Sequence, residues 1–339
     1  PWRRGAMIAA AGGELVVWGG VREESPGGGG RALLRTDGAR LDPATGTWRP
    51  MSQVNAPSGR SYARGVWMGT RLVVWGGIGT QSNPYQCGPG PDVCEPAGGG
   101  AVYDPAADAW TPMSADGAPG ARRWPVVKRV GDSALVWGGV KHPDGGLYDV
   151  AANRWQALPP PPGPLANATL DDFEVAVSGG KIIVITNVPS AAVYDVASAR
   201  WTAVPDAELP FGLKDLRSLG DGGLRLIVKR EAEGKLGVGW LARVNADAAR
   251  WEVAPLSEKA PTSLETGIIA WTGEQLVVWG PRFQELRYER IPGAVKPCGP
   301  RVPGQPICDP AIPMREVRLG RGGSEGGVFR PAFTPARVR

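Results

Sequence analysis

Histidine is almost absent from this chain of 339 residues, which has only His142. Acid–base and metal chemistry at neutral pH often relies on histidine, because its pKa lies near 7 and its ring nitrogens bind transition metals. The short loop around it, Lys141 to Gly146, supplies neither serine nor cysteine as a nucleophile. We therefore expect His142 to be a surface loop residue, and we expect no catalytic residue, no cofactor and no metal site.

Long apolar runs are also missing, since no stretch of 18 apolar residues occurs, and this excludes a membrane-spanning helix. No segment has the period of a long amphipathic helix. The chain begins at Pro1 without a signal-peptide pattern, so we expect part of a larger chain or assembly. The net charge is only +5, and no block of five basic residues occurs, which argues against nucleic-acid binding and leaves acidic glycans or an acidic protein surface as partners.

One spacing recurs through the chain: an aromatic or aliphatic residue, Asp or Asn, and then Trp six positions later. The five copies are Leu41-Asp42 to Trp48, Tyr103-Asp104 to Trp110, Tyr148-Asp149 to Trp155, Tyr194-Asp195 to Trp201 and Val244-Asn245 to Trp251. A sixth, degenerate copy reads Tyr288-Glu289 to Val295. A fixed unit repeated at intervals of about 45 to 60 residues is typical of propellers and other repeat folds.

A second signature precedes most copies, an apolar run that ends in Trp-Gly. It occurs at Leu15 to Gly20, Leu72 to Gly77, Ala134 to Gly139 and Leu276 to Gly280. Short runs of Val, Ile, Leu and Trp bounded by Gly, Pro and Asp predict strands joined by tight turns. The repeated tryptophans are then expected to be apolar wedges between stacked sheets rather than ligand-stacking residues.

The two signatures together resemble the kelch repeat, in which the second strand of a blade ends in Gly-Gly and the next two strands form the Tyr-Asp…Trp hairpin. The resemblance implies an all-β chain, a six-bladed β-propeller of kelch-like four-stranded blades spanning residues 1–298. The expected blades are 3–51, 60–113, 122–159, 170–205, 213–255 and 264–298. A disulfide loop and a Gly/Pro/Arg-rich tail, 299–339, would follow, with residues 309–339 over the outside of the ring or along one face.

The four cysteines form two local pairs in similar Pro/Gly frames, Cys87 with Cys94 and Cys298 with Cys308. Of the three possible connectivities we favour the local one, because the ends of each loop must meet in any case. A four-cysteine zinc site is the alternative, although zinc ligands are usually closer together in sequence. Disulfides require an oxidising compartment, so we expect an extracytoplasmic protein that is periplasmic, at the cell surface or secreted.

Long insertions and arginines mark one face of the predicted disc. Between the Gly-Gly strand and the next strand, blades 1 and 2 insert Val21 to Arg40 and Ile78 to Val102. Arg3, Arg60 and Arg122 each precede the first strand of a blade at the same phase. Arginine suits carboxylates and phosphates, so these three are the candidate ligand-binding residues. The alternative is that each arginine braces a neighbouring loop.

The functional expectation is therefore a binding or scaffold module that uses loops on one propeller face for protein or glycan interaction. A carbohydrate-active enzyme similar to a sialic acid mutarotase is the alternative. In that case Asp171, Asp172, Glu174 and Glu265 would lie opposite the arginines, but nothing in their spacing shows that they converge, and a solvated loop is the simpler interpretation.

Overall fold

The computed structural model describes residues 3–23, 32–81, 94–139, 142–167, 173–186, 190–208, 216–218, 225–230, 236–255, 268–271, 276–281, 285–290, 314–319, 324–329, 334–335 and 337–338. In these ranges the chain consists of strands, loops and one short 3-10 helix, η1 (Gly163–Asn167). The all-β prediction is therefore confirmed. No helix in the described ranges is long and apolar enough to cross a membrane.

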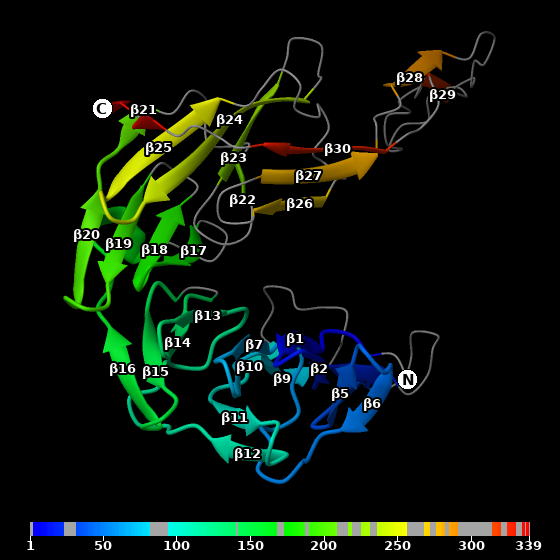
Figure 1. Ribbon diagram of the computed structural model, residues 1–339, viewed down its shortest axis with the longest axis vertical. Coiled ribbons are helices and arrows are strands. Elements are labelled where there is room, and N and C mark those ends of the chain that lie inside the picture. Colours follow the sequence, from blue (N-terminus) through cyan, green and yellow to red (C-terminus); the bar gives the residue numbers. More distant parts are fainter. Residues whose placement is uncertain are drawn as a thin grey trace, which may run out of the picture. The chain divides into compact units, whose positions relative to one another are not determined.

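Four antiparallel sheets of four strands follow one another along the first two thirds of the chain (Figure 1). Sheet 1 contains β1 (Met7–Ala11), β2 (Glu14–Trp18), β5 (Gly38–Asp42) and β6 (Thr47–Pro50). Sheet 2 contains β7 (Arg64–Trp67), β8 (Leu72–Trp75), β11 (Gly100–Asp104) and β12 (Ala109–Pro112). Sheet 3 contains β13 (Val126–Val130), β14 (Ser133–Trp137), β15 (Gly145–Asp149) and β16 (Arg154–Leu158). Sheet 4 contains β17 (Phe173–Ser178), β18 (Lys181–Thr186), β19 (Ala191–Asp195) and β20 (Arg200–Val204).

Two sheets follow these four. Sheet 5 has five strands, β22 (Leu216–Ser218), β23 (Arg225–Arg230), β24 (Leu236–Asn245), β25 (Arg250–Pro255) and the late strand β31 (Thr334–Pro335). Sheet 6 has three strands, β26 (Ile268–Trp271), β27 (Leu276–Pro281) and β30 (Ser324–Phe329). Four pairs of strands stand apart from the main sheets: β3 (Val21–Glu23) with β4 (Ala32–Leu34), β9 (Ile78–Gln81) with β10 (Cys94–Pro96), β21 (Ala207–Glu208) with β32 (Arg337–Val338), and β28 (Glu285–Arg290) with β29 (Met314–Leu319).

The chain divides into two compact units. Unit 1 contains residues 1–226, 242–253 and 333–339, and unit 2 contains residues 227–241 and 254–332. Sheets 1 to 4 belong to unit 1, and sheet 6 with the β28–β29 hairpin belongs to unit 2.

Sheet 6 differs from the sequence-based prediction in its third strand. The degenerate copy at Tyr288-Glu289 lies in β28, which pairs with β29 and not with β27. Instead β27 pairs with β30, from the segment predicted to be a tail. Leu276 faces Phe329 and Trp279 faces Gly326, which repeats the register of Leu72 with Tyr103 and Trp75 with Gly100 in sheet 2. The assignment of Tyr288 to the third strand of this sheet is therefore wrong, because a long insertion separates β27 from β30.

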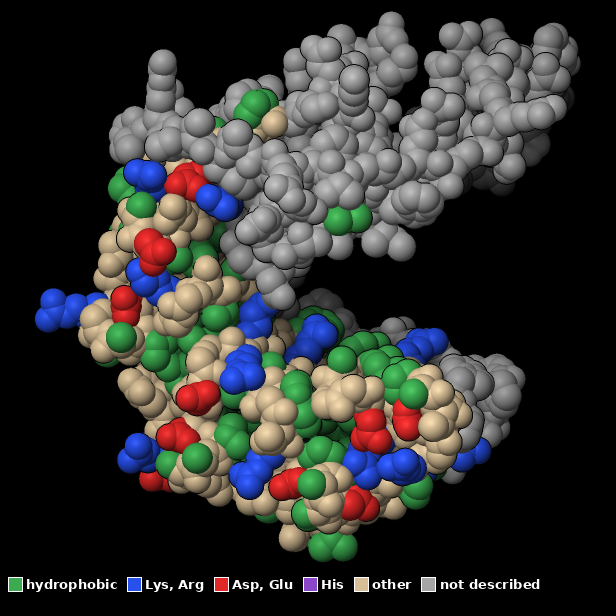
Figure 2. Space-filling view, in the orientation of Figure 1, with side chains coloured by type: hydrophobic (Ala, Val, Ile, Leu, Met, Phe, Trp, Pro, Cys, Tyr) green, Lys and Arg blue, Asp and Glu red, His purple; other side chains and the backbone are tan. Residues whose placement is uncertain are grey.

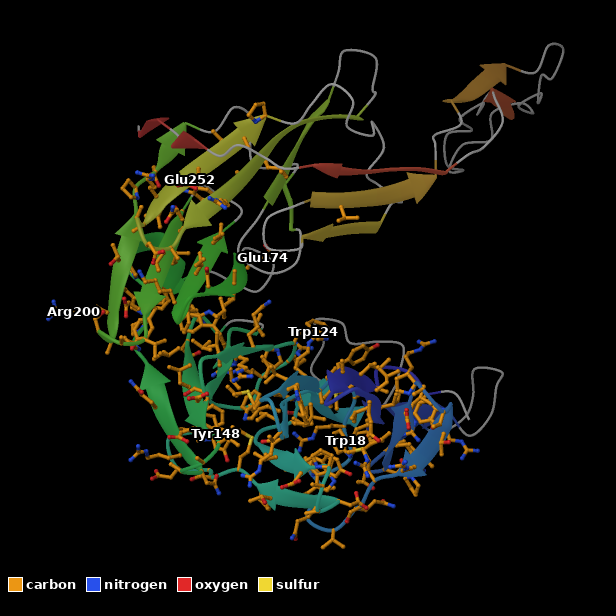
Figure 3. All side chains as sticks on the ribbon, in the orientation of Figure 1. Trp18, Trp124, Tyr148, Glu174, Arg200 and Glu252 are labelled. Atoms are coloured by element: carbon orange, nitrogen blue, oxygen red, sulfur yellow. The ribbon has the colours of Figure 1, made fainter. Side chains whose placement is uncertain are left out.

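The apolar core of unit 1 lies between neighbouring sheets. The first strands are adjacent, β1 to β7, β7 to β13 and β13 to β17. One buried cluster joins sheets 1 and 2, a second joins sheets 2 and 3, and a third joins sheets 3 and 4. Figure 3 shows the side chains that fill these layers, with Trp18 and Tyr148 labelled. Since each sheet covers the face of the next, no sheet forms a core alone.

In sheets 2, 3 and 4 the hairpin tryptophan packs on the second-strand tryptophan of the preceding sheet. The ring centroids are 5.6 Å apart for Trp110 and Trp18 and 5.5 Å apart for Trp137 and Trp201. The indole N–H of Trp110 also donates to the carbonyl of Ser52, which follows sheet 1. Trp155 repeats both contacts, with Trp75 at 6.4 Å and Ser114 as acceptor. The constant phase of tryptophan in the sequence is thus explained by packing between sheets, as predicted.

The fixed spacing between Asp and Trp follows from the geometry of one turn. The carboxylate of Asp104 accepts a hydrogen bond from the N–H of Ala106, as Asp42, Asp149 and Asp195 do two residues on. Four residues after the Asp or Asn, the backbone has positive φ at Gly46, Asp108, Asn153, Ala199 and Ala249. A hairpin with this turn places tryptophan opposite tyrosine, as Trp110 faces Tyr103.

Candidate functional site

The three predicted arginines occupy equivalent positions in sheets 1, 2 and 3. The Nη1 group of each donates to the carbonyl of the glycine 16 residues later, at the end of the second strand. The three bonds are Arg3 to Gly19 at 3.0 Å, Arg60 to Gly76 at 3.2 Å and Arg122 to Gly138 at 3.2 Å. Each Nη1 also donates to the carbonyl that precedes the third strand. Those acceptors are Asp37 at 3.0 Å, Gly99 at 3.0 Å and Asp144 at 2.8 Å.

The Gly-Gly step creates the turn that these arginines hold. Gly76 and Gly77 have φ of 66° and 106°, a region that other residues rarely adopt. A Cβ on Gly77 would lie 2.5 Å from the carbonyl oxygen of Ser61, so a side chain there would displace the backbone after Arg60. Turns leave carbonyls without ladder partners, and the guanidinium with its five donors satisfies them. We call each of these arginines with its carbonyl acceptors a brace.

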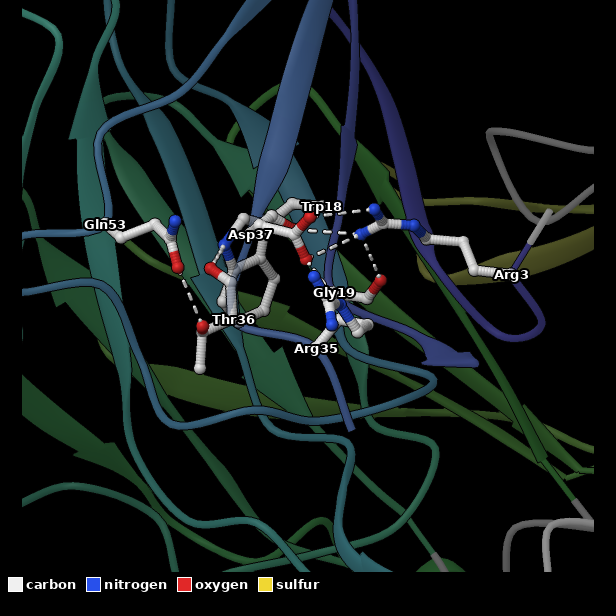
Figure 4. Close-up of polar contacts among 7 residues, drawn as sticks. All are labelled: Arg3, Trp18, Gly19, Arg35, Thr36, Asp37 and Gln53. Carbon is white, nitrogen blue, oxygen red and sulfur yellow. Dashed lines mark hydrogen bonds and ion pairs between the residues drawn. The ribbon is translucent and has the colours of Figure 1, made fainter. Parts of the chain in front are cut away.

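In sheets 1 and 3 the brace includes a carboxylate. Arg3 donates to both carboxylate oxygens of Asp37, at 3.2 and 3.0 Å (Figure 4). Arg122 donates to both oxygens of Asp144, at 3.1 and 3.3 Å. A hydrogen bond from Arg35, assisted by Arg3, holds the pKa of Asp37 far below its usual range. In both sheets a bidentate ion pair neutralises the guanidinium.

Sheet 2 has glycine, Gly99, at the position of those aspartates. The guanidinium of Arg60 therefore meets only neutral acceptors among the described residues. They are the carbonyls of Ser58, Gly76, Gly98 and Gly99 and the hydroxyl of Ser58. Arg60 is 4% exposed, and burial lowers its pKa to about 10. Its hydrogen bonds are thus made without an opposite charge.

The braces anchor the two insertion hairpins. Arg4, which follows Arg3, forms a backbone bridge with Val21, the first residue of β3, and Ser61 forms the same bridge with Ile78, the first residue of β9. Strand β4 of the first hairpin contacts β9 of the second. The described strands of the two insertions are therefore neighbours. Each insertion begins at a residue, Val21 or Ile78, that pairs with the residue directly after a brace arginine.

Two aromatic residues at these positions were not singled out in the sequence. Tyr62 and Trp124, each two residues after its brace arginine, have positive φ of 54° and 52°. The equivalent residue in sheet 1 is Gly5, and the ring of Tyr62 lies over it. Arg123 stacks over the indole of Trp124 at 5.7 Å from the centroid. A strained backbone at two aromatic residues is uncommon, and both rings are half-buried.

The single histidine belongs to the brace of sheet 3. Nδ1 of His142 lies 3.7 Å from the Oδ1 atom of Asp144. Burial, with the nearby charge of Arg122, lowers the pKa of His142 despite this carboxylate. Among the described residues, no three His, Cys, Asp or Glu side chains lie close enough to hold a metal ion.

Several predicted residues lie outside the described ranges. Cys87, Cys298 and Cys308 do so, and for Cys94 only its backbone, in β10, is described. Asp171, Asp172 and Glu265 are likewise outside the described ranges, whereas Glu174 lies in β17 and is partly buried (Figure 3). The structure therefore does not test the enzyme alternative, which would need these acidic side chains to converge.

The face of unit 1 seen in Figure 2 carries Lys and Arg side chains interspersed with Asp and Glu. A search among models of protein families matched none of them, and a search of curated protein sequences found no match either. The functional argument consequently depends on the residues themselves.

Proposed function

We propose that the chain is a binding or scaffold module whose insertion hairpins contact a protein partner or an acidic glycan. The observation that carries this proposal is the contact between β4 and β9, which are described strands of the insertions of sheets 1 and 2. Long loops on a rigid β scaffold are frequent carriers of recognition. The braces supply that rigidity, because they hold the base of each insertion through several hydrogen bonds.

We further propose that the sheets are blades of a closed six-bladed kelch-like propeller. The support is the packing of unit 1, in which the hairpin tryptophans of sheets 2, 3 and 4 each pack on the second-strand tryptophan of the preceding sheet. Trp48 belongs to sheet 1, which has no preceding sheet, and it is 52% exposed. A sixth blade that closed the ring would cover it. An experimental structure with an open arc or seven blades would contradict this proposal.

The proposed location is extracytoplasmic, periplasmic, at the cell surface or secreted, and it rests on the two cysteine pairs. Peptide mapping without reductant is expected to find Cys87 joined to Cys94 and Cys298 joined to Cys308. Reduction should leave the sheets folded, since neither pair would link two sheets. Bound zinc in stoichiometric amount, or a bridge between the two loops, would contradict the assignment.

The binding proposal is tested by shortening the hairpins. A variant in which residues 24–31 are replaced by a two-residue turn, and a second in which residues 82–93 are replaced likewise, should lose binding to an envelope fraction and to immobilised acidic glycans. The control is a variant with Val54, an exposed residue on the loop after sheet 1, changed to Ser. Equal binding by the control and by both shortened proteins, at unchanged melting temperature, would exclude the hairpins as the contact surface.

A further inference from the structure

Sheet 2 differs from sheets 1 and 3 in the residue before its third strand, at position 99. In sheets 1 and 3 the residue before the third strand is an aspartate, Asp37 or Asp144. Its carboxylate accepts hydrogen bonds from both Nη groups of the brace arginine. In sheet 2 that residue is Gly99, which retains only the backbone part of the contact, from Nη1 of Arg60 to its carbonyl oxygen. The three braces therefore share two backbone contacts, to the glycine after the second strand and to the residue before the third, and differ in charge.

An anion beside the buried guanidinium of Arg60 would stabilise its charge. A charge removed from water is costly unless an opposite charge compensates it, and hydrogen bonds to neutral carbonyls compensate only in part. Arg122 is as buried as Arg60 but has Asp144 at 3.1 Å. For Arg60 the nearest substitute among the described residues is the hydroxyl of Ser58, at 2.9 Å from Nη2. That hydroxyl accepts a bond but brings no charge.

The backbone at the position of the missing carboxylate, Gly98 and Gly99, is exposed, whereas Arg60 itself is 4% exposed. In sheets 1 and 3 the side chains of Asp37 and Asp144 are 28% and 52% exposed, so a carboxylate at this place reaches water while it pairs with the arginine. A Cβ on Gly99 would meet no described atom within 4 Å. The exposed Gly98-Gly99 segment is therefore the side from which a carboxylate in solvent can reach Arg60.

We propose that sheet 2 carries a carboxylate-binding site, in which a carboxylate from another molecule pairs with the guanidinium of Arg60 beside Gly99. Nη1 of Arg60 already donates to three carbonyls, so the new charge-assisted bond would come from Nη2, whose one acceptor among the described residues is the hydroxyl of Ser58. The site lies at the base of the β9–β10 hairpin. The proposal thus specifies a carboxylate as the ligand of the binding face. Its biological partner, an acidic side chain or an acidic sugar, rests on the proposed function. Carboxylate binding itself is measured without any partner.

The test compares wild type with two reciprocal variants. Gly99→Asp gives sheet 2 its own carboxylate, and Asp tolerates the positive φ of 62° at this position better than most residues. Asp144→Gly removes the carboxylate from sheet 3 and creates a second site like that of sheet 2. Melting temperatures are measured over a titration from sodium chloride to sodium acetate at constant ionic strength, which keeps screening equal.

Acetate is expected to raise the melting temperature of the wild type saturably, by about 2 to 4 °C when the site is filled. Gly99→Asp should show no acetate response, and Asp144→Gly should show a larger response than the wild type. Titration of acetate with detection by calorimetry should give one site in the wild type and none in Gly99→Asp.

Three results would overturn the proposal. The first is an equal acetate response in wild type and Gly99→Asp. The second is the absence of a larger response in Asp144→Gly, which needs no new side chain and so applies even if Gly99→Asp fails to fold. The third concerns Asp92, an acidic residue between β9 and β10 that is close in sequence to Gly99. An acetate response that appears only after Asp92→Asn would mean that the carboxylate at Arg60 comes from this chain. Loss of partner binding with an intact acetate response would instead refute the proposed function alone.

Discussion

Sheets 2 and 3 are built on the same plan and differ in one charge. Both place a second-strand tryptophan opposite glycine, Trp75 with Gly100 and Trp137 with Gly145. Both have a buried arginine brace, and both have an aromatic residue with positive φ two positions later. Yet sheet 3 pairs its arginine with Asp144, and sheet 2 has Gly99 in that place. Hydrogen bonds from arginine to backbone carbonyls are therefore common to the braces, whereas compensation of the arginine charge differs from sheet to sheet.

The largest expected effect is on the free energy of unfolding, when two tryptophans at the same phase of the repeat, Trp110 and Trp48, are changed to alanine. Trp110 is 3% exposed and packs on Trp18, so Trp110→Ala should reduce the free energy of unfolding by about 3 to 5 kcal/mol. Trp48 has the same sequence phase but is 52% exposed in the structure. Denaturant unfolding of both variants is the measurement. The closed ring that we propose covers Trp48, so Trp48→Ala should be about as costly as Trp110→Ala. A much smaller cost would show that Trp48 is uncovered in the folded protein and would contradict the closed ring.

A smaller effect is expected at the glycines opposite tryptophan. A Cβ on Gly100 would lie 2.0 Å from the carbonyl oxygen of Val74, and one on Gly145 would lie 2.2 Å from that of Val136. Gly100→Ala and Gly145→Ala should each cost about 1 to 3 kcal/mol, because the strands must separate. In sheet 4 the pair is Ile185 with Ala191, so alanine is accepted where the tryptophan is absent. Unchanged thermal stability in both variants would mean that the close approach is not needed.

Much of unit 1 could be predicted from sequence because its turns are fixed by local chemistry. Asp42 and its equivalents each accept a hydrogen bond within a turn that has positive φ four residues after the aspartate. The fixed length of this turn keeps the spacing from Asp to Trp constant. The third strand of sheet 6 was missed because Phe329-Arg330 replaces Tyr-Asp there and about 40 residues separate it from β27. A signal did exist: Gly326-Gly327-Val328-Phe329 has the pattern of Gly145-Gly146-Leu147-Tyr148.

The candidate site was predictable only in part. The arginines have a constant separation of 16 residues from their glycine acceptors, and such a spacing is visible in a sequence. The carboxylates are not at constant separation, since Asp37 is 34 residues from Arg3 and Asp144 is 22 residues from Arg122. Insertions of different length intervene. Neither the ion pairs nor the lack of one at Arg60 could therefore be read from spacing.

The smallest expected effect is a pH dependence confined to the charged braces. Arg35 and Arg3 depress the pKa of Asp37 in the folded protein, so its ion pair stabilises the protein above the unfolded pKa of about 3.9. That contribution is lost as pH falls towards the folded pKa. Asp37→Asn should thus be less stable than wild type at pH 7, and the difference should shrink below about pH 4. A difference that stays constant from pH 7 to pH 3 would show that the charge of Asp37 is not what matters.

The most direct measurement of the central claim is an experimental structure of the protein crystallised from sodium formate. We predict a formate carboxylate within hydrogen-bond distance of Arg60 Nη2 in sheet 2. At Arg122 the oxygens of Asp144 should occupy the equivalent place, and no formate should bind. An Arg60 guanidinium already paired with an acidic side chain of its own chain, or one with no anion beside it at saturating formate, would contradict the account.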